Sequence, residues 1–118
     1  METLTKLAPF LLRARVLEVG RERLAQVKKK LAYLLVTTDL SPNSLREVLT
    51  GYSCPVYQCL TAEDVERLFG FHNTKILGFH RGPLATSVLP DLRPFAVARP
   101  KTADMSPQNV QKRRDGKE

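Results

Sequence analysis

The sequence predicts an α/β protein: a three-layer α/β/α sandwich, built as a single small domain around a mixed sheet. Stretches with helical spacing of apolar residues alternate with short apolar runs that are typical of buried strands. The polar residues 38–44 separate the apolar run 32–36 from an amphipathic stretch, so a strand ends there and a helix begins. Ser41 can cap that helix, and Pro42 suits its first turn.

The length of 118 residues suits one domain and a short tail. A hydrophobic content of 42% is enough for a packed core. Apolar residues become rare late in the chain, where prolines and the basic residues 112–114 appear. We therefore expect a domain over residues 1–95 and a basic, disordered tail over residues 96–118.

The first part of the chain predicts two helices separated by Gly20. The first covers residues 4–19, although Pro9 also allows a start at residue 8. The second covers residues 21–31 and has one apolar stripe with charged residues elsewhere. The residues that form the two stripes are Leu4, Leu7, Leu11 and Leu12, and then Leu24, Val27 and Leu31.

The rest of the domain predicts three strands and three helices in alternation. The strands are expected at residues 32–37, 54–59 and 75–79, and the helices at residues 42–50, 61–70 and 82–89. Thr61 and Asp64 form a weak capping box, and Pro90 stops the last helix. The alternation favours parallel pairings with right-handed crossovers. A fourth strand is expected near Gly51 or within residues 95–98, and the sheet order is left open.

The net charge of +7 favours a polyanionic partner, although a solvated basic surface gives the same balance. The cations concentrate between residues 13 and 30, where they are Arg13, Arg15, Arg21, Arg23, Lys28, Lys29 and Lys30. A helix that begins after Gly20 would present N–H groups to phosphate beside these cations. The Glu22 carboxylate could accept hydrogen bonds from base amino or imino groups, or it could simply be solvated.

Two further places could contribute to a binding site. Asp39 ends the first predicted strand, at the edge where α/β proteins commonly hold ligands, but it could equally stabilise the turn. The loop of residues 71–74 includes His72, Asn73 and Thr74, which could stack on or hydrogen-bond to a base. An ordinary loop is the alternative.

No enzyme motif is present, so we expect no catalytic residues, no metal and no cofactor. Cys54 and Cys59 are expected to point to opposite faces of one strand, which disfavours a disulfide. A thiol-dependent enzyme using either cysteine remains open, and complete burial of both sulfurs would remove it. No apolar run is long enough for a membrane span, and the N-terminus lacks the layout of a signal peptide, so we expect a cytoplasmic protein. We also expect it to be a monomer.

The chain resembles the kink-turn-binding ribosomal-protein superfamily over residues 11–92. That superfamily includes an archaeal large-subunit ribosomal protein, the snoRNP core proteins and small bacterial YlxQ-type proteins, and the YlxQ type is the most similar. The resemblance is carried by Ala14-Arg15 leading into Gly20, by Leu34-Leu35-Val36, by Thr38-Asp39-Leu40-Ser41-Pro42-Asn43-Ser44, by Cys54-Pro55-Val56, by Leu68-Phe69-Gly70 and by Gly82-Pro83-Leu84-Ala85.

The resemblance implies a three-layer fold that clamps a sharply bent RNA. The family's recognition segment, Gly-x-Asn-Glu-x-x-Lys, falls on residues 20–26 and keeps the glycine. Glu22 stands at its Asn, as in the YlxQ type, Arg23 at its Glu and Gln26 at its Lys. The second contact loop falls on residues 70–76, which adds Lys75, and Ser41 takes a position that is often acidic in strong binders.

Together these features predict a non-catalytic protein that binds structured RNA, most simply a kink-turn-like ribosomal RNA. The ribosome or ribonucleoprotein proteins are further expected partners. The alternative is a protein-interaction module of the same fold that has lost specific kink-turn binding. The RNA-binding residues are expected to be Gly20, Arg21, Glu22, Arg23, Gln26, Lys28, Lys29, Lys30, Asp39, Ser41, His72, Asn73, Thr74 and Lys75.

Overall fold

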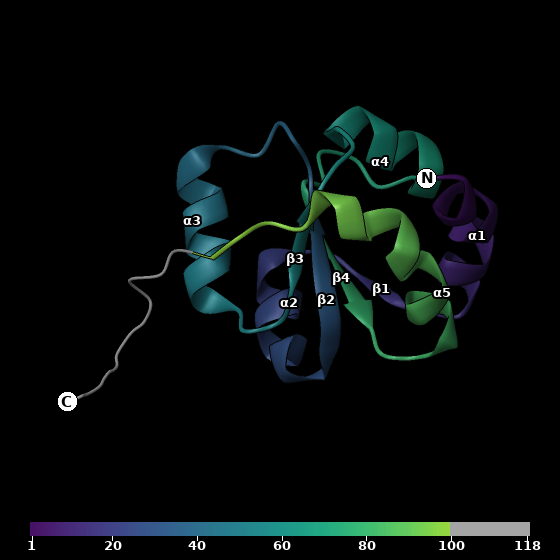
Figure 1. The fold of residues 1–118 in the computed structure, drawn as a ribbon, viewed down its shortest axis with the longest axis horizontal. Coiled ribbons are helices and arrows are strands. Elements are labelled where there is room, and N and C mark those ends of the chain that lie inside the picture. The colour runs from purple at the N-terminus through teal and green to yellow at the C-terminus, as the bar shows by residue number, and fades with distance from the viewer. Residues whose placement is uncertain (100–118) are drawn as a thin grey trace.

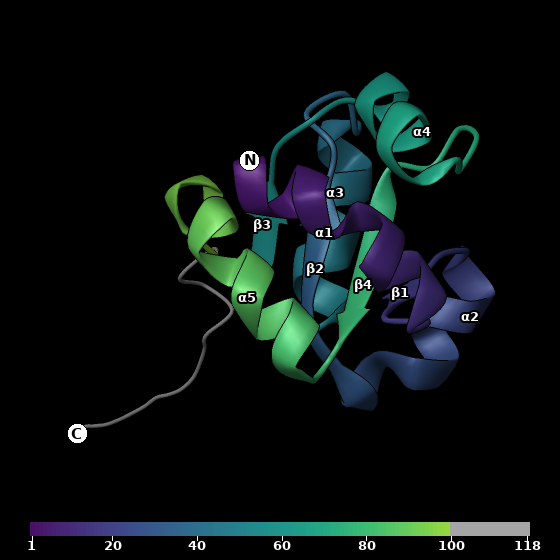
Figure 2. The ribbon, with the colours of Figure 1, turned by 90° about the vertical axis from the view of Figure 1, so that its right-hand side faces the viewer.

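A computed structural model describes residues 1–99 and confirms the α/β sandwich. A four-stranded mixed sheet has the order β1-β4-β2-β3. Helices α2 and α3 cover one face, and α1, α4 and α5 lie on the other side (Figures 1 and 2). The helices are α1 (Glu2–Arg13), α2 (Arg21–Val27), α3 (Pro42–Gly51), α4 (Ala62–Phe69) and α5 (Pro83–Leu92), and the strands are β1 (Leu17–Glu18), β2 (Leu31–Val36), β3 (Val56–Gln58) and β4 (Ile76–His80).

The expectation of parallel pairing is correct for one strand pair and wrong for the others. Strands β2 and β3 are parallel, whereas β4 runs antiparallel to both β2 and β1. The cause is α4, which lies at the end of the sheet where β3 finishes instead of crossing back along the face (Figure 1). The chain therefore enters β4 from that same end and runs in the opposite direction.

The first predicted helix is too long, and the missing fourth strand lies within it. Helix α1 begins at Glu2, includes Pro9 and ends at Arg13. Arg15 then adopts a left-handed conformation with φ of 57°, which no α-helix continues. The chain turns there, and the Val16 carbonyl accepts a 2.8 Å hydrogen bond from the His80 N–H as β1 joins the sheet.

Other boundaries shift because tertiary contacts outweigh local signals. The second predicted helix stops at Val27, and a 3-10 turn, η1 (Lys28–Lys30), leads into β2. Helix α5 continues through Pro90 to Leu92, because Leu92 is fully buried and the Asp91 carboxylate accepts the Leu4 N–H at 3.0 Å. The capping box of Thr61 and Asp64 is confirmed, and Gly70 ends α4 with a left-handed φ of 83°.

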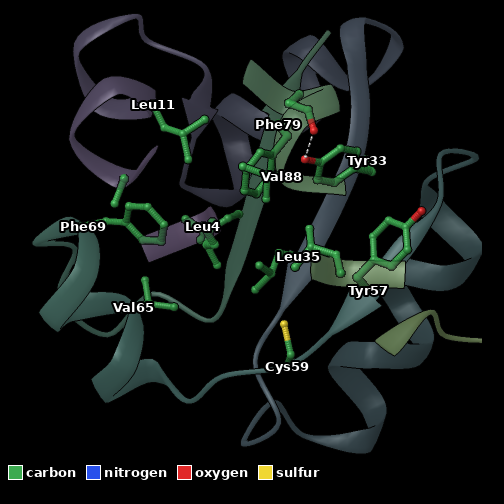
Figure 3. Packing of buried hydrophobic residues seen from close by; sticks show 14 residues of the cluster. Leu4, Leu11, Tyr33, Leu35, Tyr57, Cys59, Val65, Phe69, Phe79 and Val88 are labelled. Carbon is green, nitrogen blue, oxygen red and sulfur yellow. Dashed lines mark hydrogen bonds between the residues drawn. The ribbon is translucent and has the colours of Figure 1, made fainter. Parts of the chain in front are cut away.

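Two hydrophobic clusters lie on the two faces of the sheet. The larger joins α1, α4 and α5 to the sheet through residues such as Leu4, Tyr33 and Phe79 (Figure 3). The smaller joins α2 and α3 through Leu24 and Val48. Cys59 belongs to the larger cluster and Cys54 packs against the smaller, so the cysteines face opposite sides as predicted and both are free.

The ordered chain continues past the expected domain boundary at residue 95. After the 3-10 turn η2 (Arg93–Phe95), Ala96 bridges to Tyr57, and the Val97 N–H donates a 2.9 Å hydrogen bond to the Val56 carbonyl. The Arg99 guanidinium donates to the Leu49 and Cys54 carbonyls. Residues 96–99 thus line the outer edge of β3, while the rest of the expected tail lies outside the described residues.

Candidate functional site

A groove of about 390 Å³ opens at the end of the sheet where α2 and α3 begin. Three separate segments meet there: the start of α2, the turn from β2 into α3, and the loop before β4. The predicted site residues that line it are Gly20, Arg21, Asp39, Ser41, Asn73, Thr74 and Lys75. Leu24, Leu40, Ser44 and Ile76 complete the lining. Residues distant in the sequence therefore form one surface.

Gly20 makes the sharp entry from β1 into α2. Its backbone has φ of 94° and ψ of 132°, a conformation that residues with a side chain rarely adopt. The Gly20 carbonyl accepts the first helical hydrogen bond, from the Leu24 N–H at 2.9 Å. Glycine provides no side-chain cap for α2, and Gly20 and Arg21 both line the groove.

Ser41 and Asp39 are held by helix starts on either side of the groove. The Ser41 hydroxyl accepts a hydrogen bond from the Ser44 N–H at 3.2 Å and so caps α3. Both Asp39 carboxylate oxygens lie 3.3 Å from the Ala62 N–H at the first turn of α4. Asp39 lies in the turn after β2, and its side chain contacts the start of α4 instead of the backbone that follows it.

The pKa of Asp39 lies below its usual value. The nearby Thr37 hydroxyl, the Ala62 N–H and the positive charge of Lys75 each lower this pKa, while partial desolvation opposes them. The hydroxyl is fully buried but does not reach hydrogen-bond geometry with any atom of residues 1–99. The carboxylate is thus ionised at neutral pH and adds a negative charge to the groove lining.

The loop before β4 forms the third side of the groove. Asn73 adopts a left-handed φ of 50°, and its side chain is exposed. The Thr74 hydroxyl donates to the His72 carbonyl at 3.0 Å, and the Lys75 carbonyl accepts from the Thr37 N–H at 2.9 Å. These bonds fix the loop backbone and leave the Asn73 amide and the Lys75 ammonium directed outward.

Several predicted site residues lie away from the groove lining: Glu22, Arg23, Gln26, Lys28, Lys29, Lys30 and His72. Arg23 pairs with Glu18 at 3.1 Å and lies 3.4 Å from the Gln26 side chain. His72 pairs with Glu66 at 2.9 Å. The three lysines follow the far end of α2, so the basic residues 13–30 do not form one continuous surface at the glycine.

The cysteines are poorly suited to nucleophilic chemistry. Burial raises the pKa of the Cys59 thiol to about 11 and also raises the pKa of Cys54. A thiol-dependent enzyme was to be excluded only if both sulfurs were completely buried. Cys59 is buried but Cys54 is only half-buried, so burial alone argues against Cys59 and not against Cys54. Both thiols stay protonated at neutral pH, whereas a reactive cysteine needs a lowered pKa.

Residues 1–99 hold no group of three or more His, Cys, Asp or Glu side chains that could bind a metal ion. Across the same residues, no helix combines the length and the apolar character that a bilayer crossing requires. The groove gathers charged and hydrogen-bonding groups from separate elements of the described chain.

Comparisons with known proteins bear on the fold alone. No protein-family model matches the chain, and no curated protein matches it. A solved structure described as a protein with unknown function from Bacillus halodurans C superposes with a TM-score of 0.64 and 19% sequence identity. The match covers 77% of this chain and 94% of that one, so the sandwich fold occurs there as a nearly complete chain.

Proposed function

We propose that the protein is a non-catalytic RNA-binding protein that holds a structured, kink-turn-like RNA in the groove. The observation that carries this proposal is the convergence of Gly20 and Arg21, Ser41, and Asn73 to Lys75 in one groove. The family resemblance places its two RNA-contact segments on residues 20–26 and 70–76, and both segments contribute to this groove. Ribosomal RNA is the simplest source of such a structure.

The chemistry of the groove suits a folded RNA better than a simple polyanion. Arg21 and Lys75 line the groove and supply positive charge for phosphates. The Asn73 amide offers both donors and an acceptor to base edges. A site that combines phosphate contacts with base-edge contacts is typical of proteins that recognise bent or irregular RNA.

The experiment is a fluorescence-anisotropy titration with three labelled RNAs: a kink-turn, a plain duplex and a single strand. We expect the kink-turn to bind most tightly. Replacing Arg21 and Lys75 by Gln should weaken kink-turn binding by roughly 10–100-fold, because two charge-assisted contacts are lost. The matched control is Lys6→Gln with Arg93→Gln, which removes the same charge from exposed residues outside the groove. Equal losses from the two pairs would refute the groove as the RNA site.

A protein-interaction module is the second candidate, and one feature favours it. A smaller hollow of about 160 Å³ adjoins the groove between α2 and α3. Leu24, Val48, Tyr52 and Ile76 form its apolar walls, and Arg21, Ser44 and Glu47 complete the lining. Apolar walls suit a peptide or a protein segment more than a phosphate backbone. The ratio of absorbance at 260 and 280 nm distinguishes the candidates. RNA that copurifies and is released by a high-salt wash supports RNA binding, and clean protein supports the module.

A further inference from the structure

Three exposed cations lie beside one another at the end of the sheet opposite the groove. They are Arg15, Arg81 and Lys30, which we call the basal row. Leu31 of β2 pairs with His80 of β4, so Lys30 and Arg81 lie just beyond that pair. The Val16 carbonyl accepts the His80 N–H on the other side of β4, which brings Arg15 beside Arg81. Because β1, β4 and β2 are adjacent strands, the backbones of Arg15, Arg81 and Lys30 lie side by side at this end of the sheet.

The basal row is free to bind a partner. All three side chains are exposed, and none forms an ion pair within residues 1–99. The Arg81 guanidinium donates to the Lys29 carbonyl at 3.3 Å, which holds it close to the lysines of η1. Neutral backbone contacts of this kind orient the cation without neutralising its charge.

Neighbouring lysines extend the positive surface toward α3. A hollow of about 540 Å³ is lined by Lys28, Lys29 and Arg99 together with residues 49–53. Lys28 is anchored, since its ammonium donates to the Gly51 carbonyl at 3.2 Å and lies 5.5 Å from the centre of the Tyr52 ring. Lys29 is exposed, so its charge adds to that of the basal row.

Glu18 lies near the basal row, because its carboxylate contacts His80, the residue before Arg81. Glu18 is bound by Arg23 and His80, and Glu66 by His72. Asp91 is bound to the N-terminal amine, and Asp39 faces the first turn of α4. No acidic side chain lines the hollow beside Lys29. None of these carboxylates pairs with Arg15, Lys30 or Arg81, so the basal row keeps its positive charge.

We propose that the basal row is a second nucleic-acid contact, which binds the phosphate backbone of a double-stranded segment without reading its sequence. Exposed cations that form no ion pair within residues 1–99 complement the closely spaced negative charges of a duplex. The strand β2 has six residues, so the basal row lies roughly 20 Å from the groove. A folded RNA held in the groove would thus leave the row free for a neighbouring helix of that RNA. The inference rests on the proposed function only in taking nucleic acid as the partner.

The test uses a fluorescein-labelled duplex RNA with no loops or bulges, titrated with the full chain at several salt concentrations. Replacing Lys30 and Arg81 by Gln should weaken duplex binding about tenfold and lower the slope of log K against log salt by roughly 2. The pair Lys6→Gln with Arg93→Gln removes equal charge elsewhere and should leave that slope unchanged. Arg15→Gln alone should lower the slope by roughly 1. Circular dichroism confirms that each variant is folded.

The outcomes separate this proposal from that of the groove. Suppose that Lys30→Gln with Arg81→Gln weakens duplex binding while the chain still prefers the kink-turn. This result supports the second contact, even if replacing Arg21 and Lys75 by Gln has no effect on RNA binding. Equal losses from the basal and control pairs overturn the proposal, as does a wild-type chain that does not bind the duplex. Binding to vesicles that contain phosphatidylserine, without binding to duplex, would assign the surface to an anionic membrane and also overturn it.

Discussion

Leu24 of α2 packs directly on the backbone of Gly78 in β4. A Cβ atom added at Gly78 would lie 2.7 Å from the Leu24 Cδ2 atom and 2.9 Å from the Leu31 Cδ2 atom. This close approach seats α2 on the sheet, and α2 carries Gly20 and Arg21 at its start. The absence of a side chain at Gly78 thus sets the position of one wall of the groove.

Gly78→Ala should destabilise the protein by about 1–3 kcal/mol, because the new methyl group forces two buried leucines to move. Urea denaturation measures the change. The matched control is Gly51→Ala at the end of α3, where an added Cβ meets nothing within 4 Å. That variant should gain about 0.5–1 kcal/mol from the better helix propensity of alanine. Similar losses at both positions would show that contact with Leu24 is not what requires a glycine.

Gly20→Ala should cost about 1–3 kcal/mol through backbone strain alone. The space around Gly20 is open, so no steric clash contributes to the loss. Gly70→Asn is the comparison, because Gly70 adopts the left-handed region that asparagine tolerates. Thermal unfolding should show a larger decrease in Tm for Gly20→Ala. A Gly20→Ala variant with unchanged stability would mean that the turn into α2 relaxes freely.

Tyr33→Phe should cost about 1 kcal/mol. The Tyr33 hydroxyl donates to the Ala85 carbonyl at 2.7 Å and so ties β2 to the first turn of α5 (Figure 3). Burial raises the pKa of Tyr33, so the hydroxyl stays protonated and keeps donating. The carbonyl retains its helical partner in the variant, which limits the loss to that of one neutral hydrogen bond. The urea midpoint measures this loss of stability. The comparison is Phe79→Leu, which removes the ring that stacks on Tyr33 but leaves the hydroxyl in place, so it reports on ring packing and not on the hydrogen bond.

Glu18 should make the stability depend on pH on the acid side. Burial alone would raise the pKa of Glu18, but hydrogen bonds and charges from Arg23 and His80 outweigh it and hold this pKa below the usual 4.5. A lowered pKa in the folded state contributes stability above pH 4.5, which is lost as the pH falls through the lowered value. Glu18→Gln should therefore be less stable at neutral pH and less sensitive to acid.

Unfolding by urea between about pH 6 and pH 3 measures this effect. The control is Glu63→Gln, since Glu63 is exposed and forms no ion pair within residues 1–99. If the stability of Glu18→Gln falls with pH as steeply as that of the wild type, Glu18 does not cause the loss of stability in acid.

Local signals were enough to predict most helices and strands and the layered architecture. The caps at Ser41 and Thr61 are recognisable because each depends on residues three apart. Strand β1 could not be predicted in the same way. Its two residues follow a helical leucine pattern, and their extended conformation depends on pairing with Phe79 and Gly78, far along the chain.

The site was predictable where it depends on turns. Gly20, Ser41 and Asn73 occupy positions that need a glycine, a cap or a left-handed residue, and the sequence marks each of them. The cations were harder to place. Arg23 forms an ion pair with Glu18. Lys30 follows α2, which runs along the sheet, so it lies at the end of the sheet opposite the groove. Cations that are close in the sequence are therefore not close in space.

The segment of residues 96–99 has a consequence for handling the protein. It occupies one side of β3, the last strand of the sheet, through the Val97 hydrogen bond and the Ala96 bridge. A chain shortened to residue 95 would leave those backbone groups open to strands of other molecules, and we expect it to self-associate at high concentration. Light scattering of chains that end at residues 95 and 99 compares the two, and the shorter chain should form the larger particles.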